Sequence, residues 1–316
     1  MTEIVPLADV TVGSLPRTLE GGAVSIGNFD GVHLGHAGLL GQVRDLAERL
    51  KGPSIACLFD PHPIAILRPE IAPQRLTTIE ERARRMTGLG IEYLVVCQTT
   101  PELLQLSPTD FFEGLLRVNL RCRGLIEGEN FRFGKARSGN VSLLKTLCEA
   151  SGIEFRIADL RANQGEVISS TRVRELLSEG DVAGAARLMD APHRIDGIVE
   201  SGDRRGREIG FPTANVGGIS VLLPQPGVYA GHAIVEGKTY KAAIHLGPSP
   251  TFASGSAAKV EAHLLNFDGD LYGRSLAVEF VDRIRGVRQF DSAKTLIEQL
   301  TKDVADAEQM LEGELT

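Results

Sequence analysis

Residues 25–36 read Ser-Ile-Gly-Asn-Phe-Asp-Gly-Val-His-Leu-Gly-His and follow a short apolar run. This order predicts a strand, then a tight glycine turn, then a helix that continues to Leu50. The first backbone amides of a helix have no intrahelical partner, so an anion is the expected occupant of such a turn. His33 and His36 would share one face of that helix, where both imidazoles could donate to the same phosphate.

Two histidines beside a turn are often only polar surface residues. The longer pattern is far more specific, and it resembles the phosphate-binding signature of the nucleotidylyltransferase superfamily. The resemblance implies that His33 and His36 are catalytic, because in that family the pair stabilises charge on the α-phosphate during attack. It implies no covalent intermediate. The other residues of this segment that it assigns to nucleotide binding are Gly27, Asn28, Phe29, Asp30 and Gly35.

Length and charge narrow the class of protein. A chain of 316 residues suggests about two domains. The net charge of −7 argues against nucleic acid as a main partner, because a duplex binder needs a concentrated basic face. The four cysteines lack Cys-x-x-Cys spacing and are expected to be reduced core thiols.

No segment resembles a signal peptide, and no apolar run is long enough to span a bilayer. We therefore expect a cytoplasmic protein with no membrane partner. A weak homo-oligomer is compatible with the sequence.

Short apolar runs alternate with amphipathic helices through the first half of the chain. Strands are expected at 54–59, 91–96 and 124–128, and helices begin at the cap signals Thr78 and Ser107. Continuous apolar runs are typical of strands buried on both faces of a parallel sheet. We predict an α/β domain that is Rossmann-like, with a doubly wound parallel sheet.

Residues 60–63, Asp-Pro-His-Pro, follow the first of these strands. Open α/β sheets bind ligands just beyond the carboxyl ends of their strands, which makes Asp60 a candidate binding residue. Ordinary turn chemistry explains the same four residues equally well.

Residues 129–139 combine two aromatic rings with an amide and three cations. Flat apolar surface beside cations suits a planar heterocycle joined to phosphate. The segment resembles the Gly-x-Asp/Asn-Phe-x-Phe-Gly motif of bacterial FAD synthetases. We assign flavin binding to Asp60, Asn130, Phe131 and Phe133.

A second motif of that family, Ile/Val-Ser-Ser-Thr-x-x-Arg at a helix start, resembles residues 168–174. Hydroxyls, free amides and arginines at a helix start can hold a triphosphate, although an ordinary hydroxyl-rich cap would look the same. The resemblance assigns nucleotide binding to Ser169, Ser170, Thr171, Arg172 and Arg174.

Composition changes near residue 190. Glycine and proline become frequent, apolar runs become short and alternating, and no long helix is expected before Ser292. This pattern predicts an antiparallel barrel or sandwich, followed by a C-terminal helix. We place the domain boundary between residues 1–188 and 189–316.

Residues 197–215 join a glycine-rich basic loop to Phe-Pro-Thr-Ala-Asn. This is not a Walker loop, because Gly-Lys-Ser/Thr is missing. It resembles the riboflavin kinase signature, which implies a β-barrel kinase whose loop wraps the ATP phosphates and whose Thr213 and Asn215 hold Mg²⁺. The phosphate-binding residues that it implies are Gly202, Gly206, Arg207, Gly210 and Pro212.

Glu261 lies in an alternating segment typical of a strand. It corresponds to the kinase family's catalytic carboxylate, the general base for the flavin's primary hydroxyl, although without that pattern a solvent-facing glutamate would be the better interpretation. Two positions depart from the family: His245 stands where asparagine is usual, and Val287 where glutamate is common. We hypothesise that these departures remove polar contacts and weaken flavin binding.

Together the resemblances cover nearly the whole chain and imply one family, the bifunctional bacterial riboflavin kinase/FMN adenylyltransferases, also called FAD synthetases. The C-terminal half would phosphorylate riboflavin to FMN with MgATP, and the N-terminal half would adenylylate FMN to FAD with release of pyrophosphate. One alternative is a nucleotidylyltransferase for another phosphate ester, with a second domain that only binds. Another is a flavin-binding regulator with a degenerate site, which loss of either histidine would favour; both are present.

Overall fold

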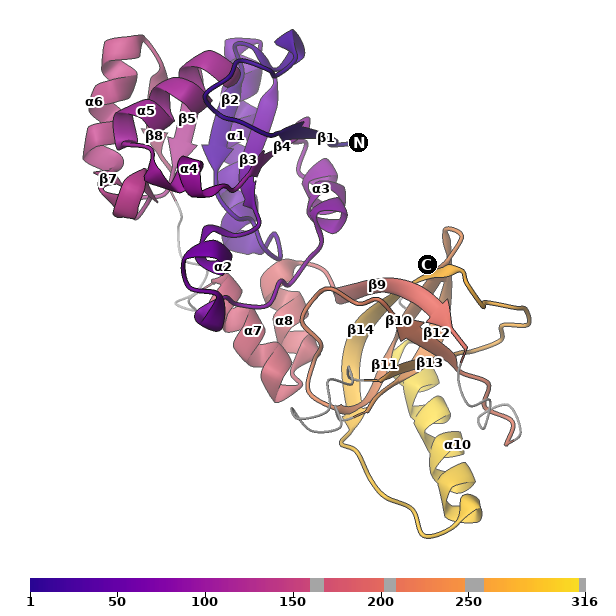
Figure 1. Cartoon of the computed structure of the whole chain (residues 1–316). Coiled ribbons are helices and arrows are strands. Elements are labelled where there is room, and N and C mark those ends of the chain that lie inside the picture. Colours follow the sequence, from indigo (N-terminus) through magenta and orange to yellow (C-terminus); the bar gives the residue numbers. More distant parts are fainter. Residues whose placement is uncertain (160–167, 202–208, 248–258, 313–316) are drawn as a thin grey trace. The chain divides into compact units, whose positions relative to one another are not determined.

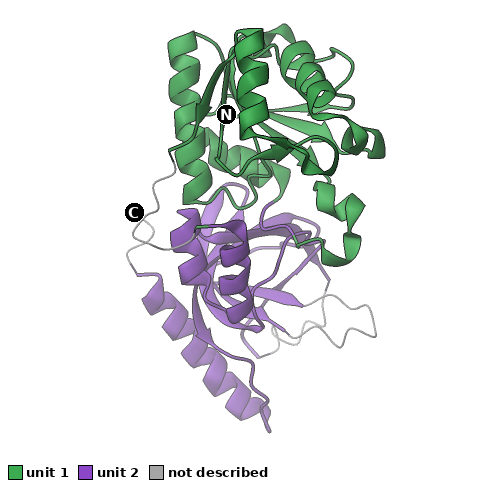
Figure 2. Cartoon of the chain, turned by 90° about the vertical axis from the view of Figure 1, so that its left-hand side faces the viewer, with its two compact units in different colours: residues 1–74, 78–168 green, residues 75–77, 169–316 purple. Residues whose placement is uncertain are grey.

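The computed structural model describes residues 1–159, 168–201, 209–247 and 259–312. These residues form two compact units (Figure 2). Unit 1 comprises Met1–Gln74 and Thr78–Ile168, and unit 2 comprises Arg75–Thr77 and Ser169–Thr316.

Unit 1 is an α/β unit built around a parallel sheet (Figure 1). Its elements in chain order are β1 (Glu3–Leu7), η1 (Arg17–Leu19), β2 (Ala23–Ile26), α1 (Leu34–Leu50), β3 (Ser54–Asp60), α2 (Pro63–Leu67), η2 (Pro69–Ile71), α3 (Ile79–Gly88), β4 (Tyr93–Gln98), α4 (Pro101–Gln105), α5 (Pro108–Phe111), η3 (Phe112–Asn119), β5 (Gly124–Glu127), β6 (Arg132–Phe133), η4 (Lys135–Arg137), β7 (Gly139–Asn140), α6 (Val141–Ser151) and β8 (Glu154–Ile157).

The sheet has six strands in the order β1-β4-β3-β2-β5-β8, and all neighbours are parallel. Every residue of the central strand β2 is buried, which agrees with its apolar sequence. The apolar patterns of the edge strands β1 and β8 are weaker, and the sequence did not predict these two strands.

Separate hydrophobic clusters cover the two faces of this sheet, so the predicted doubly wound fold is confirmed. One face packs against α1 and α3 through residues such as Val43 and Met86. The other packs against η3 and α6 through residues such as Leu115 and Leu144. The cap signals also form as predicted, because Thr78 and Ser107 accept hydrogen bonds from Glu81 N and Asp110 N.

Unit 2 holds two short helices, a barrel and a long helix. Its elements are α7 (Ser170–Glu179), α8 (Val182–Met189), β9 (His193–Glu200), β10 (Ala214–Gly217), β11 (Gly227–Val235), β12 (Lys238–Leu246), β13 (Val260–Leu264), β14 (Ser275–Arg285) and α10 (Ala293–Met310). The strands close into an antiparallel barrel in the order β10-β13-β12-β11-β14-β9. This confirms the barrel rather than the sandwich.

Alternate residues of the barrel strands face inward and outward. Tyr229 and Phe280 are fully buried, and their rings meet edge to face at 5.3 Å inside the barrel. On the outer face α10 packs against β11, β12 and β14 (Figure 1). Ala230, Ala243 and Ala307 belong to one buried hydrophobic cluster there. Small side chains let the helix approach closely, and the rest of this outer face stays available for a binding site.

The sequence predicts a boundary after residue 188, whereas the compact units divide after residue 168. The difference is α7 and α8, which belong to unit 2, where α8 packs against β9 and β14. As a boundary between two activities, residue 188 stays a prediction.

The four cysteines are free and buried, as expected. Within the described residues, no helix has the length and apolar character needed to cross a membrane.

Candidate active sites of the two units

The loop between β2 and α1 brings the predicted phosphate-binding residues together. Phe29 is fully buried, and its ring lies so close to Gly27 that a Cβ there would approach it to 3.1 Å. Gly31 has φ of 84°, a conformation that glycine adopts without strain. The local sequence therefore folds the loop back beside the start of α1.

His33 and His36 lie at the N-terminus of α1 with their rings stacked, 3.7 Å between centroids. His33 Nδ1 accepts a hydrogen bond from His36 N at 3.3 Å and so caps the helix. Phe29 meets His36 edge-on. Burial first, and then the electrostatic effects of the neighbouring His33 and Arg82 side chains, keep the pKa of His36 well below its usual range, so this imidazole is neutral at pH 7.

Arg82 on α3 braces the same loop, and sequence analysis missed it. Its guanidinium lies 2.8 Å from Asp30 Oδ1, with both side chains 8% exposed, and it donates to Asn28 O at 2.9 Å. Arg85, one turn later, donates to Gly31 O at 3.1 Å. Two arginines on one face of α3 were the available signal, but nothing in the sequence showed that this face meets the loop.

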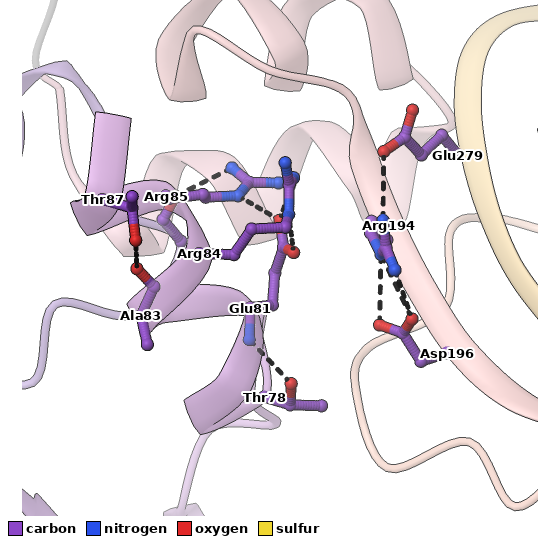
Figure 3. Close-up of polar contacts among 10 residues, drawn as sticks. Thr78, Glu81, Ala83, Arg84, Arg85, Thr87, Arg194, Asp196 and Glu279 are labelled. Carbon is purple, nitrogen blue, oxygen red and sulfur yellow. Dashed lines mark hydrogen bonds and ion pairs between the residues drawn. The ribbon is translucent and has the colours of Figure 1, made fainter. Parts of the chain in front are cut away.

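Glu81 organises the arginines of α3 (Figure 3). Its buried carboxylate lies 2.6 Å from both Arg84 Nε and Arg85 Nε. Burial acts to raise the pKa of Glu81, but hydrogen bonds from both arginines outweigh it and lower the pKa. Arg85 is thereby held where it bonds to the loop.

Glu127 is a second buried carboxyl beneath this loop. It ends β5, is 1% exposed, and its Oε1 accepts a hydrogen bond from Ile26 N at 2.7 Å, where β2 ends. Burial raises the pKa of Glu127 well above its usual range, against the opposing effect of the Ile26 hydrogen bond.

The predicted flavin residues are distributed over two loops of unit 1. Asp60 ends β3, half-buried, at the same carboxyl edge of the sheet where β2 ends. Phe131 and Phe133 stack at 5.8 Å, but Phe133 is 5% exposed and packs against Phe111, so Phe131 offers the more accessible ring. Asn130 is exposed. The flavin assignment of these residues stays a prediction.

Residues 169–174 begin α7, as expected of a helix start. Ser169 caps the helix by accepting from Arg172 N at 3.2 Å, and Arg172 pairs with Glu175. These residues belong to unit 2. The assignment of Ser169, Ser170, Thr171, Arg172 and Arg174 to the triphosphate also stays a prediction.

Unit 2 contains a cavity of about 910 Å³ on the outer face of the barrel. Pro212, Thr213, Asn215 and Glu261 all line it, so the structure brings together four residues that the sequence assigns to the kinase site. Side chains of α10, among them Leu300, form part of its wall. This volume suits a ligand of several rings.

Three polar side chains stand side by side across the strands at this cavity. Asn215 on β10 and His245 on β12 are each directly opposite Glu261 on β13. His245 Nδ1 lies 3.4 Å from Glu261 Oε2, and Lys259 Nζ lies 2.7 Å from Oε1. The hydrogen bond from His245 and the ion pair with Lys259 outweigh burial and hold the pKa of Glu261 at about 2.

Asn215 Oδ1 is buried and has no hydrogen-bond partner among the described residues. A buried amide oxygen beside a threonine hydroxyl is a donor set that fits a hard cation such as Mg²⁺. Thr213 and Asn215 thus fit the metal role that the resemblance gives them.

The remaining kinase residues are only partly described. Gly210 has φ of 86°, and the Pro212 carbonyl lies 2.7 Å from His263 Nδ1. Gly202, Gly206 and Arg207 lie outside the described residues. Val287 is 43% exposed and is not among the cavity residues, unlike His245.

At the α10 side of the cavity, Arg285 and the buried Asp303 form a bidentate ion pair at 2.6 and 2.8 Å. The Arg285 guanidinium also lies 5.8 Å from the Phe290 ring. Sequence analysis missed this pair, because its two members lie on separate elements.

Two family models match the chain, one described as FAD synthetase over residues 15–172 and one as riboflavin kinase over residues 189–311. Fold, sites and matches define the class: a nucleotidyltransferase joined to a small-molecule kinase, both of which use ATP. Relatives named bifunctional riboflavin kinase/FMN adenylyltransferase from Escherichia coli (strain K12) and Bacillus subtilis (strain 168) are each 35% identical. The matches cover 90% of this chain, with 91% of the first relative and 90% of the second. The chain belongs to the bifunctional riboflavin kinase/FMN adenylyltransferase family.

A solved structure has the same fold over nearly the whole length of this chain. The crystal structure described as a macrolide-efflux protein from Streptococcus pneumoniae is 27% identical, with a TM-score of 0.86 over 96% of this chain and 98% of that one. The two family models and the curated relatives show that the protein is an enzyme with a riboflavin kinase domain and an FMN adenylyltransferase domain.

Proposed function

We propose that the two reactions use separate sets of residues: His33 and His36 in unit 1 for adenylyl transfer, and Glu261, Thr213 and Asn215 in unit 2 for phosphoryl transfer. The observation that carries this proposal is that the two sets of residues belong to different units. The stacked histidines start α1, and the Glu261 set lines one cavity of the barrel.

In unit 1, an FMN phosphate oxygen attacks the α-phosphorus of ATP, and the bond to pyrophosphate breaks. The amides at the start of α1 and a neutral His36 can donate to the oxygens that gain charge. His36 Nδ1 is buried and has no hydrogen-bond partner among the described residues. No structural hydrogen bond from the described part of the chain therefore holds the ring at this atom. The Arg82 and Arg85 contacts fix the loop beside it.

In unit 2, the primary hydroxyl of riboflavin attacks the γ-phosphorus of ATP while Glu261 accepts its proton. Thr213 and Asn215 would hold Mg²⁺, which supplies positive charge to the phosphates. The apolar and aromatic wall that includes Leu300 and Phe290 suits the flavin ring system.

Predictions that rest on sequence alone are the cytoplasmic location, the weak homo-oligomer and the lack of a nucleic-acid partner.

Reciprocal variants test this assignment. His36→Ala should lower FAD formation from FMN about 10² to 10³-fold, because one preorganised donor is lost, and leave riboflavin phosphorylation unchanged. Glu261→Gln keeps the size of the side chain and removes the base, so FMN formation should fall about 10² to 10⁴-fold while FAD formation from supplied FMN continues.

Each variant is the folding control for the other. Both activities are measured by incubating the full chain with MgATP and either riboflavin or FMN and separating the flavins by chromatography. Equal loss of both activities in a folded variant would refute the division of residues.

A further inference from the structure

Both oxygens of the Glu261 carboxylate are held by basic side chains. Lys259 Nζ lies 2.7 Å from Oε1 and His245 Nδ1 lies 3.4 Å from Oε2. Lys259 precedes Glu261 by two residues, and His245 faces it from β12. All three line the cavity. The carboxylate therefore has two distinct partners, one along its own chain segment and one across the sheet.

These partners oppose the action of Glu261 as a base. A carboxylate oxygen that accepts from a basic side chain is less available to take a proton from an alcohol, and both oxygens of Glu261 are engaged in this way. A base at this position needs at least one partner to leave during the reaction. Lys259 is the better candidate, because its side chain is 53% exposed and carries a flexible four-carbon stem.

The reaction brings an acceptor for that ammonium to the same place. A hydroxyl in contact with Glu261 lies about 2.6 to 3.2 Å from the carboxylate. The phosphorus lies about 3 to 3.5 Å from that hydroxyl in a reactive complex. An ammonium already 2.7 Å from the carboxylate is within a short side-chain rotation of the phosphoryl oxygens.

We propose that Lys259 is a further catalytic residue of the riboflavin kinase site, which moves from Glu261 to the transferred phosphoryl group, and that His245 is a positioning residue that holds the carboxylate meanwhile. This rests on the proposed role of Glu261 as base. The hydroxyl oxygen forms a bond to the γ-phosphorus, the bond from that phosphorus to the β,γ-bridging oxygen breaks, and ADP keeps its electron pair. The hydroxyl proton goes to Glu261, and Lys259 changes no covalent bond.

The first experiment is Lys259→Met in the full chain, with riboflavin phosphorylation measured at varied MgATP. Loss of a charge-assisted contact to the phosphoryl group should lower kcat/KM for ATP about 10- to 100-fold. KM for riboflavin should stay unchanged, and Lys259→Arg should recover most of the loss. Lys238→Met is the matched control, because Lys238 is an exposed lysine on β12 away from the cavity.

The two roles that Lys259 could have predict opposite results. If Lys259 were only an ion-pair partner, its removal would free the base and leave kcat the same or higher, which would overturn the proposal. FAD formation from supplied FMN, which uses unit 1, should be unchanged in every variant and shows that the chain is folded.

A double variant separates this proposal from the role of Glu261. If Lys259 contacts the phosphoryl group, Lys259→Met should still lower kcat/KM for ATP in the Glu261→Gln background. If the effect disappears there, Lys259 acts only through the carboxylate and the proposal fails. A wild-type rate for Glu261→Gln alone would instead refute the base itself.

His245 needs a readout of its own. His245→Ala removes the contact to Glu261 and should lower kcat without raising KM for riboflavin. His245→Asn keeps a donor at this position and should restore most of kcat. A rise in KM for riboflavin with kcat unchanged would show that His245 contacts the flavin, and would overturn its positioning role.

Discussion

The two site histidines illustrate how much of a residue's chemistry depends on its neighbours. Their spacing predicted a shared helix face, and the structure stacks their rings at 3.7 Å. The sequence did not predict that burial and the electrostatic effects of His33 and Arg82 would keep His36 neutral. A neutral imidazole can donate one hydrogen bond without adding a full charge beside Arg82.

The buried carboxyl of Glu127 makes the stability of unit 1 depend on pH. Its pKa is raised in the folded state, so the folded chain keeps this proton at pH values where the unfolded chain has lost it. Stability from this group is fully present below the unfolded pKa and declines as pH rises toward the folded pKa. Glu127→Gln should remove that decline, because a glutamine oxygen can still accept from Ile26 N.

This prediction is checked by the temperature at which FMN adenylyltransferase activity is lost. Between pH 5 and pH 8, the inactivation temperature of Glu127→Gln should rise relative to that of the natural chain. Glu149→Gln, at an exposed glutamate of α6, should show no such shift. A pH-independent difference for Glu127→Gln would contradict a raised pKa.

The two departures from the kinase family have different surroundings. His245 lines the cavity and contacts Glu261, whereas Val287 is exposed and outside it. The hypothesis that both weaken flavin binding therefore stays a prediction, and of the two residues only His245 contacts a residue of the cavity site.

At the scale of elements, a buried ion pair between Arg285 and Asp303 joins α10 to the barrel. Asp303 is 2% exposed, accepts two hydrogen bonds from Arg285 on β14 and a third from Gln299. Asp303→Ala would leave a largely buried guanidinium without its charge partner. We expect a loss of about 3 kcal/mol in the stability of unit 2.

Thermal inactivation of the riboflavin kinase measures this loss. Glu308→Ala is the matched control, since Glu308 is an exposed acidic residue of the same helix. Because Arg285 and Asp303 both line the cavity, KM for riboflavin should rise together with the loss of stability. An unchanged inactivation temperature would mean that the helix is held by its apolar contacts alone.

For the whole molecule, the two candidate boundaries predict different fragments. Fragment 169–316 keeps α7 and α8, whereas fragment 189–316 loses the packing of α8 on β9 and β14 and the hydrogen bond from Gln225 N to Leu177 O. Fragment 169–316 should therefore be the more heat-stable kinase. Equal stability of the two fragments would support the boundary at residue 188.

The complementary fragments test the triphosphate assignment. Fragment 1–188 includes residues 169–174 and fragment 1–168 does not. FAD formation from FMN should be retained only by the longer fragment if those residues bind ATP. Full activity of fragment 1–168 would remove them from the site.

The sequence by itself determined the features that short-range physics controls. Apolar run length gave buried parallel strands, cap residues such as Thr78 and Ser107 gave helix starts, and glycines at fixed spacing gave the turn before His33. Tertiary structure alone decided which distant groups meet. Arg82 reaches Asp30 from another element, and strand register sets Asn215 and His245 on either side of Glu261. Such contacts depend on packing and register rather than on local pattern, and they set the charge of His36 and the basicity of Glu261.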